Sequence, residues 1–242
     1  PSGTAGLTIT PMQSVGNERV FEVSLEKVNV PADSVIGATG EAWPIIERSI
    51  QRATAAQCIQ MLGGAEAVLD MTVEYAKGRT QFGRAIGSFQ AVQHHCARMA
   101  TDVEGSRGIA YQAVWRLSEG LTAQKEVAMA KAWIGPAYRR VCGTAHQCHG
   151  AIGFTKEHDL QLYTRRAKVH ELTYGDAKGF TSLGVDDMPL FIIGMQRSGS
   201  NLLRLMLNQL PTLAAPHPPH ILERLGPFEP NYGNLDNDEN FM

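Results

Sequence analysis

The sequence predicts a mainly α-helical protein whose largest part is a four-helix bundle. Three observations point to this fold. Apolar residues recur at helical spacing over most of residues 41–172, in long runs separated by short connections. Residues before 37 alternate as β-strands do, and residues 190–210 have the pattern of a strand, a glycine-bearing loop and a helix. The bundle is therefore expected between a small β segment and the start of an α/β unit.

The first elements are predicted to be two strands and a long helix. Leu7 to Pro11 and Val20 to Val28 carry the alternating, β-branched pattern of strands. From about Glu41 to Lys77 the apolar period becomes helical. Gly63-Gly64 interrupts this run, and we expect a close helix crossing there, because small residues let two backbones approach.

Three further helices follow. They are predicted at about Phe89–Ser118, closed by Glu119-Gly120, at about Ala123–Ala145, and at about Lys156–Leu172. The third helix of the bundle carries one apolar stripe, formed by Val127, Ala130, Ile134, Tyr138 and Val141. Long antiparallel helices with short connections make a four-helix bundle. Its aromatic core is expected to include Trp43, Trp115 and Trp133.

Composition limits the setting of the protein. A net charge of −2 over 242 residues argues against a nucleic-acid surface or an anionic-membrane surface. No apolar run is long enough to span a bilayer, and the sequence does not open with a signal peptide. The four cysteines lack the short spacings of a disulfide scaffold, which favours a reduced, cytoplasmic location. Both ends look cut, so we expect a piece of a longer reading frame.

Residues 78–90, between the first two helices, have the composition of a ligand-binding loop. Arg79 and Arg84 offer planar donors for phosphate. Phe82 and Phe89 offer flat faces, and the glycines in this stretch allow the backbone to come close to a ligand. An anionic aromatic ligand suits this set.

The pattern R-T-Q-F-G-x-x-I-x-x-F-Q-x-V-Q, which begins at Arg79, resembles the hallmark of the acyl-CoA dehydrogenase family. The resemblance continues through residues 142–154, C-G-T-A-H-Q-C-H-G-A-I-G-F, and through residues 157–167, E-H-D-L-Q-L-Y-T-R-R-A. Upstream, residues 28–37 resemble the passage from the middle β domain of that family into its C-terminal helical domain.

The resemblance covers about residues 1–183 and sets the expected domains. Residues 1–37 would be the end of the middle β domain, and residues 38–183 would be the C-terminal helical bundle. Residues 184–189 would then be a linker that precedes the α/β unit at 190–242.

This resemblance implies FAD as cofactor, an acyl-CoA thioester as substrate, and an electron-transfer flavoprotein or a similar acceptor. In the family the matching residues reach the flavin of a neighbouring subunit, which implies a dimer or tetramer of like or unlike chains. Ala151 stands where the family usually has Gly. The implied FAD contacts are Arg79, Gln81 and Phe82 at the adenine and pyrophosphate end, Phe89 and Gln90 as a second set, and Gln147, Gly150 and Ala151 in a loop along the cofactor.

The catalytic base of the family has no counterpart at its usual places. Family members remove the α-proton of the thioester with a carboxylate while the flavin accepts the β-hydrogen as hydride. Tyr174 occupies the position of the common glutamate, and Gln51, followed by the substrate-side Arg52, occupies the rarer one. A phenol releases its proton only in alkaline solution and an amide does not titrate, so neither replaces a carboxylate.

Three interpretations of the missing base stay open. A sister subunit in a hetero-oligomer supplies it, or a displaced carboxylate acts, or the chain binds flavin without dehydrogenating. The displaced candidates are Glu171 and Asp176, and Glu171 lies one helical turn before Tyr174, on a predicted shared face.

A metal site is the less favoured interpretation of the cysteines and histidines near the end of the third bundle helix. Cys142 and His146 are spaced i, i+4, but the adjacent Cys148 and His149 suit few tetrahedral sites. We therefore interpret these residues as packing groups and expect no metal.

The segment from residue 190 onward resembles the beginning of a sulfotransferase. A strand is followed by a loop that contains Arg197, Ser198, Gly199, Ser200 and Asn201, and then by a helix. Loop amides and a helix N-terminus form a phosphate site. The resemblance implies 3′-phosphoadenylyl sulfate as its ligand. A transferase that uses the bundle as an oligomerisation scaffold is thus the main alternative function, and an artefactual junction between neighbouring genes is a further one.

Overall fold

The structure is a computed structural model, which describes residues 3–177 and residue 179. The described part is mainly helical, as predicted, with helices α1 to α4 after a β-hairpin. The predictions for 190–242, including the phosphosulfate loop at Arg197–Asn201, lie outside the described residues.

The hairpin at the start of the chain consists of β1 (Leu7–Met12) and β2 (Val20–Leu25). The strands pair antiparallel, with Leu7 opposite Leu25 and Met12 opposite Val20. Ser14 Oγ donates to Glu18 Oε2 across the turn at 2.8 Å. Both predicted strands are confirmed, and the second ends at Leu25 rather than Val28.

The helical part begins after the short 3₁₀ helix η1 (Ala32–Ser34). It consists of α1 (Trp43–Gly78), α2 (Gln90–Ser118), α3 (Gln124–His149) and α4 (Leu160–Leu172). Helix α1 has a proline in its first turn. Proline lacks an amide hydrogen, but amides in the first turn of a helix make no intrahelical hydrogen bond, so none is lost there. The fourth helix begins four residues later than the sequence predicts, because residues 150–154 form the 3₁₀ helix η3.

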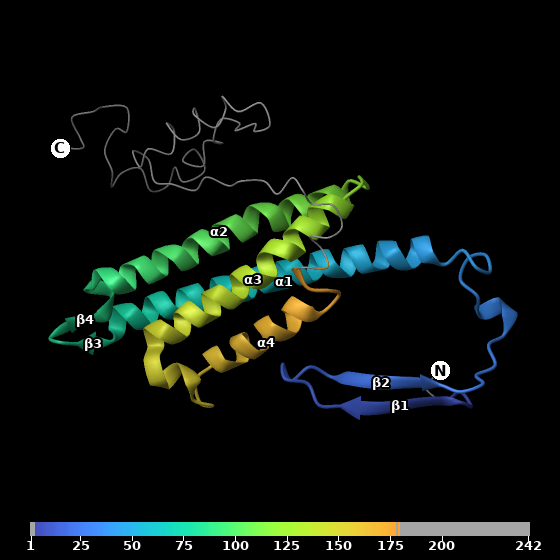
Figure 1. The fold of residues 1–242 in the computed structure, drawn as a ribbon, viewed down its shortest axis with the longest axis horizontal. Helices are drawn as coiled ribbons and strands as arrows, with labels where there is room; N and C mark the ends of the chain where they lie inside the picture. The colour runs from blue at the N-terminus through green and yellow to red at the C-terminus, as the bar shows by residue number, and fades with distance from the viewer. Residues whose placement is uncertain (1–2, 178, 180–242) are drawn as a thin grey trace, which may run out of the picture. The chain divides into compact units, whose positions relative to one another are not determined.

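Helix α3 is the central element of the bundle. It packs against α1, α2 and α4, as Figure 1 shows. All five residues of its predicted apolar stripe are buried. The core that they join also includes Met61, Val68, Met99, Val103 and Leu160.

The predicted close crossing is present at the second of the two adjacent glycines of α1. A methyl group on Gly64 would lie 2.7 Å from Cζ of Tyr138 on α3, closer than packed atoms approach. A methyl group on Gly63 would meet nothing within 4 Å. Gly64 therefore allows the close approach of α1 and α3, whereas Gly63 does not contribute to it.

The prediction of a tryptophan core is wrong for two of the three tryptophans. Trp43 and Trp115 expose 65% and 55% of their surface, whereas Trp133 packs against the core. Trp43 is the first residue of α1, before the segment where other helices cover that helix. None of the helices within residues 3–177 has an apolar stretch that would let it cross a bilayer.

Candidate functional site

The stretch predicted to be a ligand-binding loop forms a small hairpin, which we call the arm (residues 79–89). Its strands are β3 (Thr80–Gln81) and β4 (Arg84–Ala85), followed by the 3₁₀ helix η2 (Ile86–Ser88). Phe82 and Gly83 form its tip with φ angles of 53° and 79°. A two-residue hairpin turn with two positive φ angles is of type I′, which accounts for the glycine.

The arm presents aromatic and cationic groups to solvent. Phe82 is 93% exposed and meets Phe89 edge-on, with 6.2 Å between the ring centroids. The guanidinium of Arg84 lies over the Phe89 ring, 4.1 Å from its centroid. Arg79 and Gln81 are exposed on the same hairpin. A phenylalanine that stays 93% exposed at a hairpin tip, with an edge contact to Phe89, indicates a binding surface.

The second group of expected cofactor residues lies at the C-terminal end of α3. Gln147 belongs to the last turn of that helix, so its predicted place in a loop is wrong. The helix continues to His149 and ends at Gly150, whose φ of 65° is the left-handed conformation that favours glycine. Gly150 and Ala151 then open η3 (Gly150–Phe154), and both are exposed.

Tyr75 joins these two groups of residues. Its ring stacks on the His149 ring with 4.4 Å between centroids, and its hydroxyl donates to the His149 carbonyl at 3.5 Å. Its own carbonyl accepts the amide of Arg79 at 2.8 Å, at the root of the arm. The arm and the end of α3 therefore lie at the same end of the bundle (Figure 1). The sequence did not single out Tyr75, because a contact between residues 74 positions apart has no local signal.

Three histidines lie next to η3, and the His146 ring stacks on Phe154. His149 Nδ1 donates to the Ala145 carbonyl at 2.8 Å, and His158 Nδ1 accepts the Leu160 amide at 3.1 Å. His146 Nε2 lies 2.7 Å from the hydroxyl of Thr164.

That hydroxyl gives its own hydrogen to the Leu160 carbonyl at 3.1 Å, so His146 Nε2 is the donor of the pair. Burial lowers the pKa of both His146 and His149, and the nearby His158 ring lowers each further. Both imidazoles are therefore neutral near pH 7, and each has a bare ring nitrogen that is buried without a protein partner.

A cleft of about 620 Å³ lies between α2 and α3, and Gln147 is one of its lining residues. Arg140 forms a two-point ion pair in it with Asp102, at 2.7 and 3.2 Å. Arg98 and His95 line the α2 side. The sequence indicated none of these neighbours of Gln147. Within residues 3–177, no three acidic, cysteine or histidine side chains gather as a metal site would require.

The residues considered for the catalytic base lie at and after the end of α4 and in α1. Helix α4 ends at Leu172, and Tyr174 follows it with a φ of 61°. The prediction that Glu171 and Tyr174 share a helix face is therefore wrong.

Glu171 is buried and pairs with Lys168 Nζ at 3.2 Å and with Arg139 Nε at 3.7 Å. Asp176 is exposed and accepts the Gly179 amide at 2.9 Å. Gln51 and Arg52 lie in the third turn of α1, Arg52 exposed.

The exposed groups fit the adenine and pyrophosphate end of FAD in chemical character. Planar guanidinium donors suit a pyrophosphate, and aromatic faces suit an adenine ring. Around Gly150 a side chain would meet nothing within 4 Å, so the backbone of η3 is open to a close ligand.

Comparisons with known proteins show the family of the helical bundle. Residues 40–178, more than half of the chain, match the family described as "Acyl-CoA dehydrogenase, C-terminal domain". Residues 189–240 match the description "Sulfotransferase family".

One similar relative is the probable acyl-CoA dehydrogenase YngJ of Bacillus subtilis, 33% identical over 181 residues, which are 74% of this chain and 48% of the relative. The chain thus spans about half the length of the curated relatives it matches.

Two solved structures illustrate the likeness of the fold. A chain of the ChsE4-ChsE5 complex from Mycobacterium tuberculosis is 33% identical with a TM-score of 0.69, over 78% of this chain and 51% of that one. A chain from a structure of the electron-transferring flavoprotein of Acidaminococcus fermentans is 30% identical with a TM-score of 0.73, over 76% and 49%. The helical bundle, its arm and the matched residues together place this chain in the acyl-CoA dehydrogenase family, of which it carries the C-terminal domain.

Proposed function

We propose that this chain is part of a FAD-dependent acyl-CoA dehydrogenase in which the arm and the end of α3 bind the flavin of a neighbouring subunit. The observation that supports the proposal is the link through Tyr75, which joins the root of the exposed arm to the end of α3, where the backbone at Gly150 is open. When bound, the flavin would accept the β-hydrogen of an acyl-CoA thioester as hydride. The residues of this chain would bind and orient the adenine and pyrophosphate end.

A neighbouring subunit is needed because the proposed contacts lie on the surface of this one. Of the expected contacts, only Phe89 is partly buried, while the others are exposed. A flavin held on this surface would be open to water on one side unless a second chain covered it. Burial of Phe82 and of the Arg84 and Phe89 pair in that contact would contribute to assembly as well as to flavin affinity.

For the catalytic base, we propose that it comes from a sister subunit. Glu171 is buried and engaged by two cations, and Asp176 is exposed beside the Gly179 amide, so neither has the environment of a free base beside a thioester. The relative in the ChsE4-ChsE5 complex offers a precedent for two different chains associating. A displaced carboxylate and a flavin-binding chain without dehydrogenase activity are the competing interpretations.

The base proposal is tested with Glu171→Gln and Asp176→Asn in the full-length protein, assembled with its candidate partner chain. Bleaching of the flavin by acyl-CoA should keep its rate within about threefold in both variants, because general-base catalysis contributes at least about a hundredfold. A loss of a hundredfold or more in either variant identifies that carboxylate as the base and rejects the sister-subunit proposal.

The electrons are proposed to pass to an electron-transferring flavoprotein or a similar acceptor. The likeness to a chain from the Acidaminococcus fermentans structure supports this choice. Reoxidation of the acyl-CoA-reduced protein should be faster with an electron-transferring flavoprotein than with dioxygen. Equal rates would argue for direct oxidation by dioxygen.

A second candidate function belongs to the C-terminal segment. The match of residues 189–240 to a sulfotransferase family supports binding of 3′-phosphoadenylyl sulfate there, with Arg197 and Ser198 among the proposed contacts. In the full-length protein, Arg197→Ala should weaken binding of the product 3′,5′-bisphosphate at least tenfold, since a charge-assisted contact contributes about 1.5–3 kcal/mol. Unchanged binding, or none in the unmodified protein, would reject this function.

The main proposal is tested by flavin binding to the full-length protein, with Arg79→Gln and Phe82→Ala as variants. Both variants should lower FAD affinity at least about fivefold, since each removes a contact of about 1 kcal/mol or more. The exposed Arg48 offers a matched control, because Arg48→Gln also removes a surface guanidinium, but near the start of α1, whereas the arm follows the end of that helix. Equal FAD affinity in all of these proteins would reject the proposal.

A further inference from the structure

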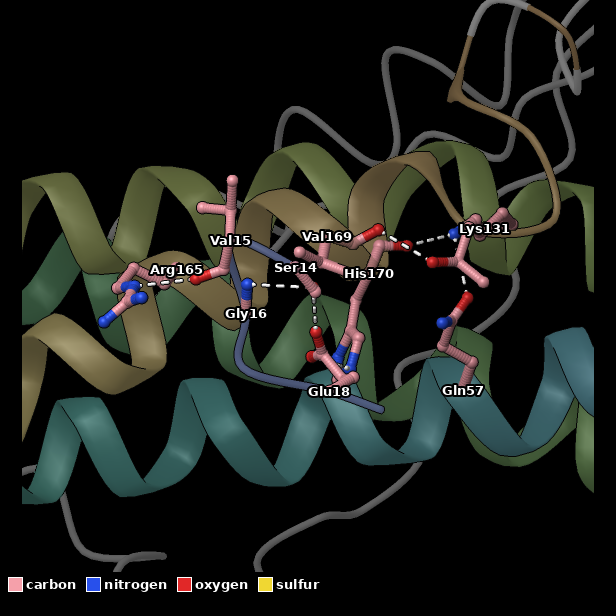
Figure 2. Close-up of polar contacts among 10 residues, drawn as sticks. Ser14, Val15, Gly16, Glu18, Gln57, Lys131, Arg165, Val169 and His170 are labelled. Carbon is pink, nitrogen blue, oxygen red and sulfur yellow. Dashed lines mark hydrogen bonds and ion pairs between the residues drawn. The ribbon is translucent and has the colours of Figure 1, made fainter. Parts of the chain in front are cut away.

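Lys131 on α3 is a charged side chain in the middle of the helical core. It is 1% exposed and is the largest fully buried side chain of the described residues. Its Nζ donates to Oε1 of Gln57 on α1 at 3.1 Å and to the carbonyl oxygen of His170 on α4. Figure 2 shows these contacts, in which one ammonium group joins three helices.

The surroundings of Lys131 are costly for a charge. Burial lowers its pKa, while Cys58 and Glu171 act in the opposite direction. Cys58 brings little compensating charge, because burial raises the pKa of its thiol to about 12. A leucine or methionine would fill such a site without desolvation, so packing alone does not explain a lysine here.

The His170 carbonyl is one of the carbonyls at the end of α4 that lack an intrahelical partner. Two other carbonyls at this end are satisfied locally: Val169 O accepts the amide and the hydroxyl of Thr173 at 3.0 and 2.9 Å, and Leu172 O accepts the Gly175 amide at 3.1 Å. In a helix that continued, the amide of Tyr174 would occupy the His170 carbonyl.

Instead, Tyr174 has a φ of 61° and the chain turns away. Lys131 thus donates where the helix amide would have donated, and a cation at this end is also favoured by the helix dipole.

The ring of His170 faces the N-terminal hairpin on the opposite side. His170 Nε2 lies 3.8 Å from Glu18 Oε1. In the same turn of the hairpin, the Val15 carbonyl accepts a hydrogen bond from Arg165 Nε at 2.7 Å. These contacts, drawn in Figure 2, fix α4 from its outer face. From the core side, Lys131 Nζ donates to the His170 carbonyl. Gln57 accepts a second hydrogen bond from the same ammonium group.

We propose that Lys131, oriented by Gln57, is a positioning residue that ends α4 at Leu172 and fixes the turn at residues 173–176. This turn carries Tyr174, at the place where the family resemblance puts the catalytic glutamate. Because the proposed function takes the base from a sister subunit, the proposal concerns the position of this turn and does not depend on a catalytic role for Tyr174.

The test compares Lys131→Met, Gln57→Leu and Gln57→Glu in the full-length protein by hydrogen exchange. Lys131→Met and Gln57→Leu should speed exchange at the Thr173 and Gly175 amides at least about fivefold, because an unsatisfied buried polar group favours local opening. Exchange in α2 should change less than twofold. Gln57→Glu, which keeps an acceptor oxygen at the same distance, should stay within about twofold of the unmodified protein at both amides.

Two outcomes would overturn the proposal. One is unchanged exchange at Thr173 and Gly175 in Gln57→Leu, which decides the matter even if Lys131→Met fails to fold. The other is an equal acceleration over all four helices, which would mean that Lys131 only stabilises the bundle.

If the unmodified protein oxidises no acyl-CoA, the proposed function fails, and hydrogen exchange still decides the positioning role.

Discussion

The ring of Tyr75 on α1 stacks on the ring of His149 at the end of α3, with 4.4 Å between centroids and 23° between the planes. Tyr75 and His149 are 74 positions apart in the sequence. Their contact joins the root of the arm to the end of α3 at one end of the bundle. The proposed flavin site depends on that relationship more than on any single donor.

Replacing Tyr75 tests the link between the arm and α3. Tyr75→Leu should weaken FAD binding by about two- to tenfold, because a stacked aromatic pair contributes about 0.5–1.5 kcal/mol. Tyr75→Phe keeps the stacking and should bind FAD nearly as the unmodified protein does, since its hydroxyl contact of 3.5 Å is long. Titration of the full-length protein with FAD measures both. Equal losses in the two variants would assign the effect to the hydroxyl instead.

The tip of the arm separates binding from stability. Phe82→Ala should change the free energy of unfolding by less than about 0.5 kcal/mol, because the side chain is 93% exposed. The same variant should lose flavin on gel filtration. Leu121→Ala, at an exposed leucine in the connection between α2 and α3, is the matched control and should keep its flavin. Denaturation together with flavin content checks the prediction, which fails if Phe82→Ala unfolds more easily or keeps its flavin.

The two adjacent glycines of α1 give a matched pair for the helix crossing. Gly64→Ala should destabilise the bundle by about 1–3 kcal/mol, because the new methyl group would overlap the buried Tyr138 ring. Gly63→Ala points into open space and should stabilise it by up to about 1 kcal/mol, through helix propensity. Urea denaturation measures both changes, and equal effects of the two would contradict the crossing geometry.

Acid should loosen the support of η3. Burial lowers the pKa of His146 and His149 in the folded protein below the value of about 6.5 in unfolded chains, so the unfolded state binds more protons below that pH. Stability should therefore be constant above about pH 7 and should fall as pH drops below about 6.5.

A double variant, His146→Gln with His149→Gln, should reduce this pH dependence, measured as the free energy of unfolding between pH 5 and 8, while His170, whose pKa burial also lowers, keeps part of it. His94→Gln, an exposed histidine on α2, is the control and should leave the slope unchanged. A slope that persists undiminished in the double variant would mean that other groups cause the acid sensitivity.

The helices were predictable from sequence because each buries an apolar stripe with a period near 3.6 residues. The limits of the sequence appear where tertiary contacts decide. Trp43 and Trp115 are large aromatic residues of the kind found in cores, yet both are exposed. Whether another element covers a side chain cannot be predicted from the segment that carries it. Likewise, the end of α4 depends on a lysine about 40 residues upstream, so the left-handed turn at Tyr174 breaks a helix face that periodicity alone would extend.

The candidate site was predictable as residue types but not as an arrangement. The composition of the arm pointed to an anionic aromatic ligand, and the arm residues are indeed exposed on one hairpin. Gln147 was expected in a loop through the family resemblance, with the helix ending at about Ala145, but the helix continues to His149 and Gly150 is its C-terminal cap. The neighbours Arg98 and Arg140 come from two helices, and no spacing within the sequence joins them.

The most direct test is the visible absorption spectrum of the full-length protein, alone and with its candidate partner chain, before and after acyl-CoA is added. The account predicts a flavin band that Phe82→Ala weakens and that acyl-CoA bleaches when the partner is present but not when it is absent. A protein that holds no flavin in either state, or a flavin band that Phe82→Ala leaves intact, would contradict the proposed binding surface. Full bleaching without the partner would contradict the sister-subunit base.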